Sequence, residues 1–146
     1  MDKVEFLILR NLLYNEEYVR KVLPFIKADY FEDYNQKVVF EEISNFVGQY
    51  NQPATKEVLC IETEKRQDIN DSSFQEITKL ISYLEDEPSE FNWLVNTTEK
   101  WCRDRAIYLA LMESIQLADG KDEEKDRDAI PNILSLDGLI SHDRES

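Results

Sequence analysis

Residues that could perform acid–base or metal chemistry are few in this chain, and their spacing does not bring them together. His142 is the only histidine and lies in the polar tail, so we interpret it as a solvated residue that serves neither a Ser-His-Asp triad nor a histidine-based zinc site. The carboxylate pairs Glu16-Glu17 and Glu41-Glu42 are adjacent residues, which point to different sides of a helix. We therefore interpret them as solvated helix faces and predict no catalytic or metal-binding residue.

The glycines of the sequence are isolated from one another, which argues against a nucleotide site. A phosphate-binding loop of the form GxxxxGKS or GxxxxGKT needs two glycines in a fixed short spacing, and this chain has only Gly48, Gly120 and Gly138. We therefore predict no cofactor-binding residue in this chain.

One basic cluster, formed by Lys100, Arg103 and Arg105, could recognise an acidic group. Salt bridging within a helical hairpin is the simpler interpretation. Contact with an acidic partner or with single-stranded DNA is the alternative, so these three residues are kept as candidate partner or DNA contacts.

The composition indicates an acidic helical protein. The chain has 146 residues, enough for one domain and a short appendage, and its formal net charge is −14. Such a surface repels duplex DNA, because nucleic-acid affinity comes largely from lysine and arginine. The charge fits a solvated surface, a basic protein partner or mimicry of DNA. Scarce glycine and wide spacing between helix breakers predict an all-α fold.

Cys60 and Cys102 belong to no CxxC pair, so we expect two buried, reduced cysteines, as in a cytosolic protein. The charged start of the chain is unlike a signal peptide, and no apolar run reaches the ~20 residues that a membrane span needs.

Apolar periodicity and breakers divide the first part of the chain into short helices, which we expect to form a globular helical bundle over residues 1–88. Pro24 is expected to distort or end the second helix. Ser73 and Glu76 have the spacing of a capping box, which predicts the start of the fifth helix. The predicted helices span residues 3–14, 16–26, 35–50 and 55–64, with a fifth from about residue 73 to 84.

A long helix is predicted over residues 89–118, which contain neither proline nor glycine. At 1.5 Å per residue it would be about 45 Å long, more than a domain of this size can cover. Its second half is apolar all the way round, and Trp101, Tyr108 and Ile115 recur every seven residues, as in a packing seam. We therefore expect this half to be buried against another molecule, and the partner could be a second copy of the chain.

The remaining residues predict a protruding helical hairpin over 89–140. Nine of the ten residues in 119–128 are charged, which predicts a solvated turn. A short apolar helix over 129–140 would then fold back along the long helix. The predicted self-association surface comprises Trp101, Ile107, Tyr108, Leu111, Met112, Ile115, Ile130, Ile133 and Leu134.

The order of these features resembles the N-terminal domain of DnaB-type hexameric replicative DNA helicases, and most of all the version in T-even-like phages. The likeness covers nearly the whole chain and rests on order and spacing rather than on one diagnostic motif. It is carried by Phe6-Leu7-Ile8-Leu9, Val22-Leu23-Pro24-Phe25-Ile26, Tyr30-Phe31, Trp93-Leu94-Val95, Arg103-Asp104-Arg105-Ala106 and Ala129-Ile130-Pro131.

The resemblance implies a non-catalytic role in DNA replication. In that family the hairpins pair between subunits, and the paired domains form a collar that supports the hexamer and docks primase or a helicase loader. ATP and Mg²⁺ belong to a separate motor domain, to which residues 141–146 would begin the linker. The implied location is the cytoplasm of the bacterial host, with no membrane contact and only weak binding of single-stranded DNA.

Two other functions stay open at this stage. The helicase-binding domain of a primase resembles the helicase collar in fold. A free-standing acidic DNA mimic would instead inhibit a basic DNA-processing enzyme, although the apolar long helix argues against it.

Overall fold

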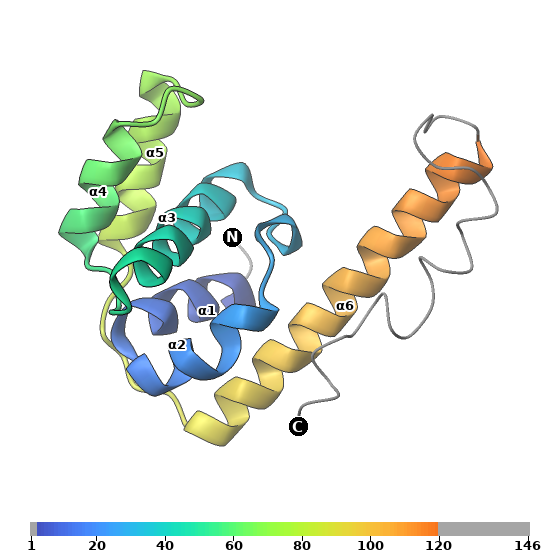
Figure 1. The fold of residues 1–146 in the computed structure, drawn as a ribbon, viewed down its shortest axis with the longest axis horizontal. Coiled ribbons are helices and arrows are strands. Elements are labelled where there is room, and N and C mark those ends of the chain that lie inside the picture. Colours follow the sequence, from blue (N-terminus) through green and yellow to red (C-terminus); the bar gives the residue numbers. More distant parts are fainter. Residues whose placement is uncertain (1–2, 120–146) are drawn as a thin grey trace. The chain divides into compact units, whose positions relative to one another are not determined.

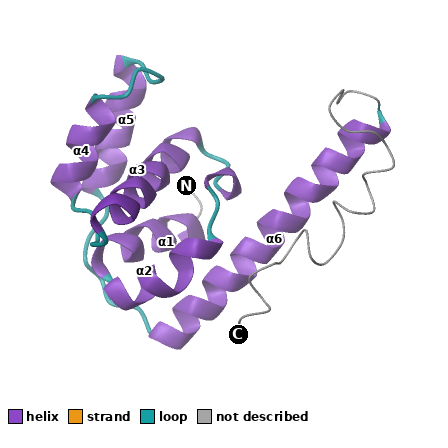
Figure 2. Ribbon diagram, viewed as in Figure 1, coloured by secondary structure: helices purple, strands orange, loops and turns teal. Residues whose placement is uncertain are grey.

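The computed structural model describes residues 3–119, and every regular element in that range is a helix (Figures 1 and 2). The all-α prediction is therefore confirmed for this part of the chain. Most of the predicted charged turn, the second arm of the hairpin over 129–140 and the linker over 141–146 lie outside the described residues. The helices are α1 (Lys3–Tyr14), α2 (Glu16–Val22), α3 (Tyr34–Tyr50), α4 (Lys56–Glu64), α5 (Asp71–Ser82) and α6 (Phe91–Ala118), with 3₁₀ turns η1 (Leu23–Phe25) and η2 (Ala28–Tyr30).

The chain divides into two compact units, Met1–Thr98 and Glu99–Ser146. The first unit contains α1 to α5 and the beginning of α6, and the second contains the rest of α6. The finer predicted division, with a bundle over 1–88 and a hairpin over 89–140, stays a prediction. Within residues 3–119, no helix is both long enough and apolar enough to cross a bilayer.

Helix α1 lies at the centre of the first unit's core. Its side chains Ile8, Leu9 and Leu12 are fully buried, as expected for a helix that is apolar on most sides. It contacts both α2 and α3, and α3 in turn contacts the paired helices α4 and α5 (Figure 1). Apolar residues recur along α3 at helical spacing, and this face is buried at Val39 and Ile43 but exposed at Tyr50, near the end of the helix.

Side-chain caps set where several helices begin. Asn70 is the N-cap of α5, and its side-chain oxygen accepts a hydrogen bond from the Ser73 backbone N–H at 2.8 Å. The predicted capping box at Ser73 and Glu76 is therefore wrong, because the helix starts a turn earlier. The prediction for Pro24 is confirmed, since α2 ends at Val22 and Pro24 lies in the 3₁₀ turn η1.

The polar stretch between α4 and α5 is fixed to α3 by Arg66. Its guanidinium bonds Glu42 at 2.7 Å, Glu41 at 3.1 Å and Asp68 at 2.7 Å. The Tyr34 hydroxyl also donates to Asp68, at 3.0 Å. Bonding to Arg66, with help from Tyr34, lowers the pKa of Asp68 to about 2. From the sequence we predicted only a break between the helices over 55–64 and 73–84.

Polar contacts also hold the segment that leads into α6 within the first unit. The Tyr14 hydroxyl donates to the backbone oxygen of Leu84 at 2.7 Å. Arg10 pairs with Glu87 at 3.4 Å and donates to the Ser89 hydroxyl at 3.3 Å. The chain therefore enters α6 from a segment that is tied to α1.

Candidate self-association surface

Helix α6 is one uninterrupted helix of 28 residues, Phe91–Ala118. It is about 42 Å long at 1.5 Å per residue. The predicted bounds, 89–118, are correct to within two residues at the start and agree at the end. The helix begins where the Glu90 carboxylate accepts a hydrogen bond from the Trp93 backbone N–H at 2.5 Å. Residues 99–118 of α6 belong to the second unit.

The second half of α6 carries five exposed large apolar side chains on one face. They lie at spacings of one, three or four residues, which places them on an arc of about 140° around the helix axis. We call this set the α6 apolar stripe. Its members and exposed fractions are Ile107 at 37%, Tyr108 at 45%, Leu111 at 47%, Met112 at 39% and Ile115 at 53%.

The other predicted members of the self-association surface are placed differently. Trp101 shares the helical register of Tyr108, one heptad earlier, but it is buried, with 8% of its surface exposed. Ile130, Ile133 and Leu134 lie outside the described residues. The structure therefore brings together five of the nine predicted residues on one exposed face.

A second face of the same helical segment is buried at Ala110, Ser114 and Leu117, which follow at i, i+4 and i+7. The Ser114 hydroxyl donates to the backbone oxygen of Ala110 at 2.9 Å, so its polar atom is satisfied inside the helix. The second half of α6 thus has one covered face and one apolar face open to solvent.

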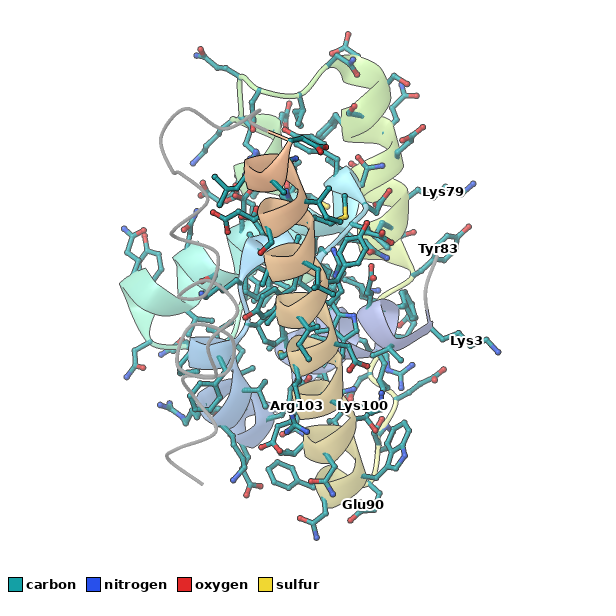
Figure 3. All side chains as sticks on the ribbon, turned by 90° about the vertical axis from the view of Figure 1, so that its right-hand side faces the viewer. Lys3, Lys79, Tyr83, Glu90, Lys100 and Arg103 are labelled. Carbon is teal, nitrogen blue, oxygen red and sulfur yellow. The ribbon has the colours of Figure 1, made fainter. Side chains whose placement is uncertain are left out.

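The basic cluster flanks the α6 apolar stripe at its N-terminal end. Lys100 bonds Asp104 at 2.7 Å, which is an i,i+4 ion pair on the surface of α6. The Arg105 guanidinium lies 4.9 Å from the centre of the Tyr108 ring, a cation–π contact. Arg103 is partly buried, and Figure 3 shows it beside Lys100 on the first half of α6.

The contact between Arg105 and Tyr108 was not foreseen from the sequence, although its i,i+3 spacing on a predicted helix is the signal that could have revealed it. It places a cation over one face of a stripe residue. The polar rim and apolar centre of this region match the general make-up of protein interfaces.

Neither cysteine is poised for nucleophilic chemistry. Burial, reinforced by the Glu99 carboxylate, raises the pKa of the Cys102 thiol to about 12. Cys60 is only partly buried, so the prediction of two buried cysteines is wrong for it, but burial also raises its pKa. Among residues 3–119, no group of three or more histidine, cysteine or acidic side chains is placed to hold a metal ion.

Comparison with known proteins finds a similarity to a phage replication protein. It is 28% identical over 151 aligned residues to the DnaB-like replicative helicase of Enterobacteria phage T4. The alignment covers 94% of this chain but only 32% of the length of that helicase. No protein-family profile matches the chain. The chain therefore resembles about a third of a phage replicative helicase.

Proposed function

We propose that this chain is the N-terminal collar domain of a phage replicative DNA helicase, where it joins subunits to one another and performs no catalysis itself. The observation that carries the proposal is the similarity to the T4 DnaB-like replicative helicase along 94% of the chain. The all-α fold of the described residues and the exposed α6 apolar stripe support the same function.

The α6 apolar stripe is the surface that would pair with a second copy. Charged residues make up 33% of the chain, so the chain has no general excess of apolar residues. The exposure of the five stripe side chains is therefore not explained by composition. Fully burying a large apolar side chain contributes about 1.5–3 kcal/mol. A two-fold symmetric pairing would bury the stripe of each copy against its partner's, since such an interface uses the same patch twice. Pairs of this kind would then assemble into the hexamer.

The remaining roles follow from the same proposal. The collar would dock primase or a helicase loader, and its net charge of −14 favours a protein partner over tight binding of single-stranded DNA. ATP and Mg²⁺ would be bound by a motor domain elsewhere in the parent protein, which would act in the cytoplasm of the bacterial host.

The similarity to a helicase supports this proposal over the two alternatives. A helicase-binding domain of a primase would be expected next to a metal-carboxylate polymerase core upstream in the reading frame. A nucleotide-binding phosphate loop encoded downstream would instead support the helicase. An acidic DNA mimic would compete with DNA for a basic enzyme, and failure of DNA to compete in a pull-down would rule it out.

Sedimentation equilibrium tests the role of the α6 apolar stripe. The chain is expected to self-associate above the monomer mass of 17.3 kDa, and Leu111→Asp is expected to shift it to monomer. Ile61→Asp is the matched control, because Ile61 lies on α4 and is exposed to the same 47% as Leu111. If the chain and both variants are all monomeric at high concentration, self-association through the stripe is refuted.

A further inference from the structure

We draw no further inference here: the strongest candidate, the open groove of about 570 Å³ between α2, the turn η1 and the end of α3, has lining charges that cancel because Arg20 pairs with Glu16, and nothing in the described part of the chain shows what covers it.

Discussion

The hydrogen bond between Tyr18 and Thr98 is expected to stabilise the first unit measurably. The two side-chain oxygens lie 2.6 Å apart, and both residues are essentially fully buried. The Thr98 hydroxyl has one hydrogen, which it donates to the backbone oxygen of Leu94 at 2.8 Å. The Tyr18 hydroxyl must therefore be the donor in the bond between them.

The direction of this bond sets the expected cost of each change. Tyr18→Phe removes the donor and leaves the bond from Thr98 to Leu94 intact, so it should lower the free energy of unfolding by about 1 kcal/mol. Thr98→Val removes the acceptor of a buried phenol and should cost about 1–3 kcal/mol. The double variant replaces both partners by apolar groups of the same shape. It should cost less than the two single changes added together, by about 1 kcal/mol.

Urea denaturation followed by circular dichroism measures all four members of this cycle. Thr97→Val is the control on the neighbouring, half-buried position, where a change of no more than about 0.5 kcal/mol is expected. If the costs of Tyr18→Phe and Thr98→Val simply add in the double variant, the two hydroxyls do not stabilise each other and the assignment is refuted.

Three further stability predictions follow from the described residues. Gly48→Ala should raise the free energy of unfolding by up to ~1 kcal/mol in urea denaturation, because Gly48 lies inside α3 and an added Cβ meets nothing within 4 Å. In the same assay Asn70→Ala should cost about 1 kcal/mol and Ser73→Ala much less, and the reverse order would contradict the observed cap. The pKa of Asp68 falls from 3.8 to about 2 on folding, so its contribution is complete above pH 3.8 and is lost as the pH falls towards about 2. Melting temperatures measured across that pH range should therefore fall less steeply for Asp68→Asn than for the parent, and parallel curves would refute the role of Arg66.

The spacing of apolar residues predicted the helices well, because the residues of a buried helical face recur every three or four positions in the sequence. The apolar spacing of α3 indicated Val39 and Ile43, which are buried, but it also included Tyr50, which is 57% exposed. Cap positions were less predictable, since both Asn70 and Ser73 are good N-caps and only the surrounding packing decides between them. At Pro24 a distortion or an end of the helix was predicted, but the change to a 3₁₀ turn was not.

The candidate surface shows where a helical pattern stops being informative. Trp101 and Tyr108 share one heptad register, yet the first is buried and the second is 45% exposed. A repeat of seven residues identifies a face, but what covers that face depends on segments elsewhere. The meeting of Glu5, Gln36 and Glu76 around one cleft could not be predicted at all, because these residues come from three helices whose packing the sequence does not state.

Because α6 is one continuous helix, the number of residues between Leu94 and the α6 apolar stripe sets the angle between them around the helix axis. Leu94 is buried near its start, and the α6 apolar stripe begins at Ile107 on the same uninterrupted helix. Deleting one residue between them would rotate the stripe by about 100° around the axis relative to Leu94, whereas deleting seven would rotate it by only about 20°. Related proteins with a shorter or longer α6 are therefore expected to differ by about 7, 11 or 18 residues, because changes close to a whole number of turns keep the stripe near its original face.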